Sequence, residues 1–253
     1  MMLLVADVHG AWARLRRVAA GGCPILVLGD LPNLIDYRTM DGLLVEVFGK
    51  GVVAEASHLR WSGDYEGARR VWRAATRGRG KEISARLGSL LREEYLAAAA
   101  ALAGAEAYAT YGNVDDPVLM AEVMGSAGIR FVDGEAVEIG GLRVGFAGGG
   151  IGPDPGAPGI VTEDEMGDKL SRIGAVDILC THVAPAVGPL GYDVVAGSSK
   201  HSVAVLEYLM DQRPPFHYFG DVHQPQATAW RVGFTRCRNV GFFRSTGRAV
   251  RHG

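Results

Sequence analysis

Short apolar runs alternate with helical patterns along much of the chain, and polar residues follow the ends of these runs. Met2–Ala6 and Pro24–Leu28 are the first two runs, with a helical spacing of apolar residues between them. Short buried strands alternating with helices are typical of β-α-β units with parallel strands. The same pattern predicts further strands at 107–111, 176–180 and 216–219, and helices at 163–173 and 202–210. We therefore expect an α/β fold.

Two sections depart from this alternation. Residues 34–105 carry apolar side chains at helical spacing, with glycine-containing breaks at 49–51 and 78–80, and so predict a helical insertion. Ile129–Phe146 has period-two stretches joined by Asp-Gly and Gly-Gly, which predicts a hairpin-rich antiparallel section. We expect one domain over 1–253, with the helical insertion at about 34–105 forming a lid over the site.

Composition excludes several classes of protein. The 253 residues are 48% hydrophobic and 21% charged, with a formal net charge of -2, so no overall attraction to nucleic acid or anionic lipid is expected. No apolar stretch has the length of a membrane span, and the N-terminus lacks the features of a secretory signal. Three widely separated cysteines predict reduced thiols rather than a disulfide framework. These features predict a cytoplasmic protein that does not associate with membranes.

Five polar clusters each follow a predicted strand. They are Asp7/His9, Asp30, Asn113, His182 and Asp221/His223. Sites in open α/β sheets lie at the carboxyl ends of strands, and these oxygen and imidazole ligands suit divalent first-row metals. The period of two along a strand is expected to place both side chains of Asp-x-His on one face. Taken singly, each cluster has an ordinary explanation as a surface turn, a helix cap or a core histidine. Together they predict a site where Asp30 bridges two cations.

The order of these clusters resembles the calcineurin-like metallophosphoesterase superfamily. Its pattern runs D-x-H, G-D-x-x-D, G-N-H-D/E, a histidine after a strand, and G-H-x-H, and it covers nearly the whole chain apart from the helical segment. The resemblance implies a two-layered β-sandwich flanked by helices, and a hydroxide between two metals that attacks phosphorus in line. It assigns Asp7, His9, Asp30 and His223 to one metal, and Asp30, Asn113, His182 and Asp221 to the other.

Three positions depart from the superfamily pattern. Asn33 replaces the second aspartate of G-D-x-x-D, Val114 replaces the histidine expected near the leaving group, and Asp221 replaces the first histidine of G-H-x-H. A carboxylate at 221 favours Mn²⁺ or Mg²⁺. The expected cofactors are two divalent ions, with manganese first and iron, zinc, magnesium and nickel as alternatives. A degenerate second site is the competing interpretation.

Further residues are candidates for contacts with the substrate. The expected catalytic residues are Asp7, Asp30, Asn113, Arg38 and His201. Arg38 could donate to the phosphate, or could be an ordinary surface arginine. Lys200 or His201 could supply the proton that Val114 cannot, with a solvated loop tip as the favoured alternative. Asp115 and Asp116 are candidates for acceptors that support the ligands, although an aspartate before Pro117 is also an ordinary helix start.

The insertion carries a basic stretch. Residues 69–92 hold eight arginines and lysines and one acidic residue, Glu82. Such a stretch could steer a polyanionic substrate or nucleic acid, but the solvated face of a helical segment is the favoured interpretation.

Two functions remain as hypotheses. The first is a dinuclear metal-dependent hydrolase acting on a phosphomonoester or phosphodiester. The second is a catalytically weakened protein of the same fold that serves as a binding scaffold. The substrate and the oligomeric state are not determined by the sequence.

Overall fold

The computed structural model describes residues 1–152 and 157–253, which form two compact units. Met1–Pro32 and Tyr95–Gly253 make up the main unit, and Asn33–Glu94 make up the helical unit. The chain has the mixed α/β character that the pattern predicts.

The first sheet of the main unit has the strand order β17-β1-β2-β3-β4. Strands β1 to β4 run parallel, and β17 pairs antiparallel with β1. The strands are β1 (Met2–Val5), β2 (Ile25–Leu28), β3 (Ala107–Thr110), β4 (Arg130–Phe131) and β17 (Val250–His252). All residues of β1 and β2 are buried, as expected for parallel strands covered on both faces. Helix α1 (Trp12–Ala19) connects β1 to β2, and α6 (Pro117–Ser126) connects β3 to β4.

The second sheet has the strand order β15-β16-β14-β9-β6-β5. Its four central strands are parallel, and the strands at both edges pair antiparallel with their neighbours. The strands are β5 (Glu135–Ile139), β6 (Leu142–Ala147), β9 (Ile178–Thr181), β14 (Phe216–Phe219), β15 (Ala229–Val232) and β16 (Thr235–Asn239).

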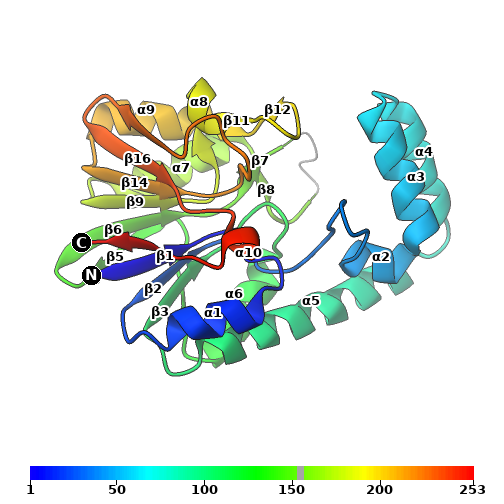
Figure 1. Cartoon of the computed structure of the whole chain (residues 1–253), viewed down its shortest axis with the longest axis horizontal. Coiled ribbons are helices and arrows are strands. Elements are labelled where there is room, and N and C mark those ends of the chain that lie inside the picture. Colours follow the sequence, from blue (N-terminus) through cyan, green and yellow to red (C-terminus); the bar gives the residue numbers. More distant parts are fainter. Residues whose placement is uncertain (153–156) are drawn as a thin grey trace. The chain divides into compact units, whose positions relative to one another are not determined.

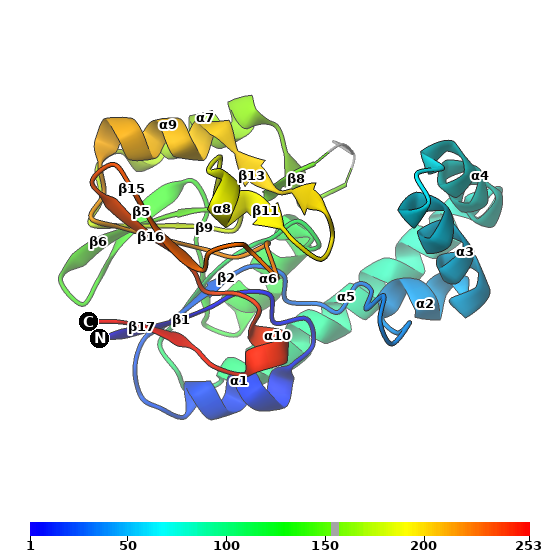
Figure 2. The same ribbon diagram turned by 45° about the horizontal axis from the view of Figure 1, so that its top comes forward.

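The two sheets pack face to face. One cluster of buried side chains combines Leu4 and Leu26 from the first sheet with Phe146 and Ile178 from the second. A second cluster lies on the other face of the second sheet, where α7 (Glu163–Ile173) and α9 (Val203–Gln212) pack. Figures 1 and 2 show these two helices above the second sheet and α1 below the first. The main unit is therefore a two-layered β structure with helices on its outer faces.

Short elements organise the connecting loops of the main unit. They are the pairs β7 (Gly150–Ile151) with β8 (Ile160–Val161), β10 (Ala184–Pro185) with β13 (His201–Ser202), and β11 (Tyr192–Asp193) with β12 (Ser198–Ser199), and the short helices α8 (Gly188–Gly191) and α10 (Phe243–Thr246).

The helical unit contains α2 (Leu43–Phe48), α3 (Lys50–Trp61), α4 (Tyr65–Thr76) and the first part of α5 (Gly80–Leu102). The predicted breaks at 49–51 and 78–80 are confirmed, because they coincide with the start of α3 and the start of α5. A further break precedes α4, where the Asp64 side chain caps the helix by accepting from the amide of Gly67 at 2.7 Å. None of the helices that the structure describes is long and apolar enough to cross a membrane.

The prediction for 129–146 is correct only in its second half. Strands β5 and β6 form an antiparallel hairpin around Gly140 and Gly141. However, β4 pairs in parallel with β3 in the first sheet, so Asp133-Gly134 is a crossing between the two sheets and not a hairpin turn. A local Asp-Gly signal predicts a reversal of the chain but not which strand receives the next segment.

Candidate metal centre

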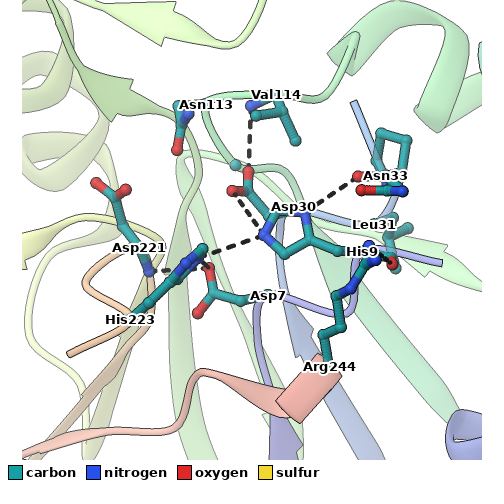
Figure 3. A network of polar contacts seen from close by, with 12 residues as sticks. Asp7, His9, Asp30, Leu31, Asn33, Asn113, Val114, Asp221, His223 and Arg244 are labelled. Carbon is teal, nitrogen blue, oxygen red and sulfur yellow. Dashed lines mark hydrogen bonds and ion pairs between the residues drawn. The ribbon is translucent and has the colours of Figure 1, made fainter. Parts of the chain in front are cut away.

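The five predicted polar clusters lie directly after strands of the main unit. Asp7 and His9 follow β1, Asp30 follows β2 and Asn113 follows β3, all in the first sheet. His182 follows β9 and Asp221 follows β14, both in the second sheet. The parallel strands bring these ends to the same side of the sandwich, where the side chains converge (Figure 3).

The backbone at this edge is left-handed at four non-glycine residues. They are Asp7 (φ 57°), His9 (φ 41°), Asp30 (φ 54°) and Asp221 (φ 65°). Such conformations cost about 1–3 kcal/mol each and cluster at functional sites. They also correct one expectation: β1 ends at Val5, so left-handed turns rather than the strand pleat orient the Asp-x-His residues.

One group of donor atoms is formed by Asp7, His9 and His223, which could together hold a metal ion. His9 Nε2 lies 3.3 Å from His223 Nε2, and His223 Nε2 lies 3.6 Å from Asp7 Oδ1. The His223 ring also stacks on Phe242, with ring centroids 4.1 Å apart. Two imidazole nitrogens and a carboxylate oxygen thus point at one position, as metal ligands do.

A second group is formed by Asp7, Asp30 and His182. His182 Nε2 lies 3.4 Å from Asp30 Oδ1 and 3.1 Å from Asn113 Oδ1. The other oxygen of Asp30, Oδ2, lies 3.7 Å from His9 Nε2 in the first group. Asp30 therefore presents one carboxylate oxygen to each group, the arrangement that a bridging ligand requires.

Backbone carbonyls orient two of the histidines. His182 Nδ1 lies 2.7 Å from the carbonyl oxygen of Leu28, and His9 Nδ1 lies 3.1 Å from that of Pro32. Because a carbonyl oxygen only accepts, Nδ1 carries the proton in both rings. Nε2 is therefore the nitrogen available to a metal, and a second partner of this kind is usual for ligating histidines.

The carboxylate of Asp7 is buried and incompletely paired. Asp7 Oδ1 accepts from the backbone amide of Asp221 at 3.1 Å, whereas Asp7 Oδ2 has no hydrogen-bond partner among the residues that the structure describes. Burial alone would raise the pKa of Asp7, but His223 and the other nearby histidines outweigh it and lower this pKa. A buried anionic oxygen without a protein partner fits a site that receives a cation.

The pKa of His182 is shifted in the opposite direction. Burial lowers its pKa, but Asp30 and Asp221 outweigh burial and raise the pKa of His182 to about 9. In the metal-free protein this histidine therefore retains a proton among the carboxylates. A metal ion bound at Nε2 would displace that proton.

Asp115 links the ends of β2 and β3. Its buried carboxylate accepts from the amides of Asp30 and Gly112, both at 2.7 Å, and from the Tyr95 hydroxyl at 3.2 Å. Asp115 thus accepts from the backbone of the residue predicted to bridge the metals, and its supporting role toward metal ligands stays a prediction. Burial, together with the nearby Asp30 charge, raises the pKa of Asp115 to about 7. Asp116, in contrast, caps α6 in the ordinary way.

Two glycines allow the backbones after β2 and β3 to come close together. A Cβ atom at Gly29, where φ is 89°, would lie 2.3 Å from the amide nitrogen of Gly112. A Cβ atom at Gly112 would lie 2.1 Å from Asp30 Oδ1. Any larger residue at Gly112 would therefore displace the candidate bridging carboxylate.

Lys200 is a member of the centre that the sequence pattern did not favour. Its Nζ donates to Asp221 Oδ1 at 2.8 Å and to the Asp221 carbonyl oxygen at 3.1 Å, so Lys200 is not simply at a solvated loop tip. Burial lowers the pKa of Lys200, but Asp221, Asp30 and Asp7 outweigh it and raise this pKa. The only sequence signal was the unexpected carboxylate at 221, which adds a negative charge that a cation can neutralise.

The remaining candidates have other contacts. His201 is half-buried on β13, its ring packs beside Gly191, and its Nδ1 is buried with no hydrogen-bond partner in the described parts of the chain. Val114 donates its backbone amide to Asp30 Oδ1 at 3.1 Å. Arg38 and Asn33 belong to the helical unit, where Arg38 lies 3.9 Å from Asp36 and Asn33 donates to Asp41 at 2.8 Å. The proton-donor role of His201 and the phosphate-binding role of Arg38 stay predictions.

Local ion pairs neutralise part of the basic stretch at 69–92. These are Arg69 with Glu66 at 2.6 Å, Arg79 with Glu82 at 2.9 Å, and Arg86 with Glu46. These pairs are exposed, which supports the interpretation of this stretch as the solvated face of helices.

Comparison with known proteins supports the fold alone. No protein-family model matches the chain, and no significant match is found among curated proteins. One solved structure is similar with a TM-score of 0.65 and 12% identity, over 96% of this chain and 90% of that chain. The crystal structure of TT1561 of Thermus thermophilus is similar with a TM-score of 0.58 and 12% identity, over 98% of this chain and 96% of that chain. The chain thus shares its overall fold with known structures across nearly its full length.

Proposed function

We propose that this protein is a metal-dependent phosphoesterase of the calcineurin-like metallophosphoesterase type, which hydrolyses a phosphomonoester or a phosphodiester. The observation that carries the proposal is the position of Asp30. Its two oxygens face two groups of histidine and carboxylate donors that share Asp7, at 3.4 Å from His182 and 3.7 Å from His9. A bridging carboxylate between two such groups is the arrangement that a dinuclear centre needs.

The donor set fits two divalent ions. Asp7, His9, Asp30 and His223 would hold the first, and Asp30, Asn113, His182 and Asp221 would hold the second. Mixed oxygen and imidazole ligands favour Mn²⁺, with iron, zinc, magnesium and nickel as alternatives. When bound, two such ions lower the pKa of a water molecule and neutralise charge on a transferring phosphoryl group.

The residues of the chain contribute position and charge. Asp115 holds the backbone of Asp30, and the amide of Val114 holds one of its carboxylate oxygens. The carbonyls of Leu28 and Pro32 fix the rings of His182 and His9. The apolar side chain of Val114 offers no proton to a leaving group, so we expect an ester with a good leaving group to react best.

A second candidate function is a binding scaffold on the same fold. The observation that favours it is the ion pair between Lys200 and Asp221, which occupies a carboxylate assigned to the second metal. A scaffold would retain the fold and lack turnover at every metal concentration, which separates it from a hydrolase whose second ion is merely weak.

The test is the Asp30→Asn variant. We expect it to retain the circular dichroism spectrum of the wild type, to bind less than one equivalent of Mn²⁺, and to lose hydrolysis of 4-nitrophenyl phosphate and bis(4-nitrophenyl) phosphate. Asp211→Asn makes the same change at an exposed position of α9 and serves as the matched control. Hydrolysis by Asp30→Asn at the wild-type rate would refute the proposal, and a wild type with metal but no turnover on either ester would favour the scaffold.

A further inference from the structure

The Lys200 ammonium has a buried partner on one side and access to solvent on the other. The Lys200 side chain is 34% exposed, whereas the side chain of Asp221 is 4% exposed. An ammonium group has three N–H donors. Two of them point to the carboxylate and the carbonyl oxygen of Asp221, and no third acceptor is found among the described residues, so one donor remains for a ligand that enters from solvent.

Lys200 is also close to the centre as a whole. Asp221, which it contacts, donates its own backbone amide to the carboxylate of Asp7. The ammonium therefore contacts a residue that is itself hydrogen-bonded to Asp7, the carboxylate that belongs to both donor groups. A positive charge at this position attracts the phosphate of an ester and repels a cation at the second metal position.

The ion pair with Lys200 also offsets the charge of Asp221, the residue that replaces the first histidine of G-H-x-H. Asp221 adds a negative charge to a centre that already contains Asp7 and Asp30, and Lys200 offsets that charge. The same contact places the ammonium 2.8 Å from Oδ1 of Asp221, the residue that the superfamily pattern assigns to the second metal. A metal ion that used this carboxylate would therefore compete with Lys200 for it.

We propose that Lys200 is a phosphate-binding cation of this centre, which shares Asp221 with the second metal position and thereby makes that position the weaker one. The inference rests on the proposed function, because it assumes metal ions at the two donor groups. It adds a substrate-binding residue, and it assigns the phosphate oxygens of the ester as the ligand of the free N–H donor.

The metal affinities test the first half of the inference. Calorimetric titration of the wild type with Mn²⁺ should show two binding events, the second weaker. In Lys200→Met the second event should tighten by about tenfold, because the ammonium that repels a cation at this position is removed. Arg213→Met removes one exposed positive charge from the end of α9 and should leave both constants unchanged.

Binding of inorganic phosphate tests the second half. With one equivalent of Mn²⁺, so that the second position stays largely empty, Lys200→Met should bind phosphate about tenfold more weakly, as the loss of a charged hydrogen bond predicts. Lys200→Arg keeps the charge and should retain most of the affinity. If Lys200 only supported the fold, phosphate affinity would not depend on a positive charge at position 200. Circular dichroism checks that each variant is folded.

The outcomes separate this inference from the proposed function. If the wild type takes up no divalent ion, both the proposed function and the inference fall. If the wild type binds Mn²⁺ but Lys200→Met leaves either the second Mn²⁺ constant or the phosphate constant unchanged, the inference alone is overturned. Tighter binding of the second Mn²⁺ together with weaker binding of phosphate in Lys200→Met supports it.

Discussion

The carboxylate of Asp115 accepts a hydrogen bond of 2.7 Å from the backbone amide of Asp30. The same oxygen accepts from the amide of Gly112 after the next strand. One buried side chain thus fixes the separation of two strand ends, and with it the position of the carboxylate that faces both donor groups. The effect on Asp30 is indirect, so Asp115 is a positioning residue.

Replacing Asp115 tests this relationship. In Asp115→Asn an amide group faces backbone N–H donors that need an acceptor, so we expect Mn²⁺ affinity to fall by about 10–100-fold. The free energy of unfolding should fall by about 1–3 kcal/mol, because a buried donor loses its partner. Calorimetry and urea unfolding measure the two effects. Asp116→Asn is the matched control, since asparagine caps a helix as well as aspartate does; equal losses in both variants would contradict the assignment.

Metal uptake should depend on pH through His182. Its folded pKa is raised to about 9, above the ordinary histidine value of 6.5. In the metal-free protein, protonation of His182 therefore contributes stability below about pH 6.5, and this contribution is lost as the pH rises through about 9. Since a metal displaces this proton, Mn²⁺ affinity should increase over the same range.

Proton release can be measured directly. Titrations with Mn²⁺ in buffers of different ionisation enthalpy should show close to one proton released for His182 near pH 7.5, which lies below its folded pKa. His182→Asn should lose most of this release, whereas His201→Asn removes a histidine that belongs to neither donor group and should not. Equal release in His182→Asn and the wild type would contradict the prediction.

The side chain at 114 should control the choice of leaving group. Val114 offers no acid, and general acid help is worth about 10²–10⁴-fold in rate. We expect the wild-type rate to fall steeply across a series of aryl phosphodiesters as the pKa of the leaving group rises. Val114→His should improve the poorest leaving groups most.

A shallow dependence in the wild type would indicate another acid. His201→Ala should then steepen the dependence if His201 is that acid. If neither variant changes the slope, the leaving-group prediction fails. Val118→His places the same side chain at an exposed position on α6 and is the control.

Acid sensitivity should arise in part from His217 in the core of the second sheet. Thr181 donates its hydroxyl to the Val183 carbonyl oxygen, so it accepts from Nε2–H of His217, and Nδ1 remains unprotonated with no partner among the described residues. Burial lowers the pKa of His217 to about 3. The folded pKa is depressed, so this group contributes stability above about pH 6.5, and the contribution is lost as the pH falls toward 3.

Urea unfolding between pH 7 and pH 4 provides the measurement. The free energy of unfolding of the wild type should decline with a slope of up to about 1.4 kcal/mol per pH unit from this one group. His217→Phe removes the ionisable group and should give a flatter profile. The control is His58→Phe, which replaces a histidine of the helical unit and should leave the profile unchanged. An unchanged pH profile in His217→Phe would contradict the prediction, because protonation of His217 would then not destabilise the folded protein.

Local patterns determined much of the main unit. The apolar runs at Met2–Ala6 and Pro24–Leu28 became β1 and β2, because a short run of buried apolar residues is stable as a strand covered on both faces. Helix α7 has the predicted bounds, and in the structure Thr162 and Glu165 form a capping box at its start. The polar residues after these strands could be identified because parallel strands carry their sites at one edge.

Only the tertiary structure decided the contacts between distant segments. Nothing near Asp133-Gly134 in sequence indicates that β4 pairs in parallel with β3 while β5 joins the other sheet, because the partners of both strands lie outside this local segment. The strands β15, β16 and β17 have mixed polar residues, and their pairing is determined by the sheets that they complete. The contact between Lys200 and Asp221 joins residues 21 positions apart, and neither shows a local pattern that predicts the other. Periodicity reports which face of an element is buried, whereas the partner of a charged side chain depends on where the chain returns in space.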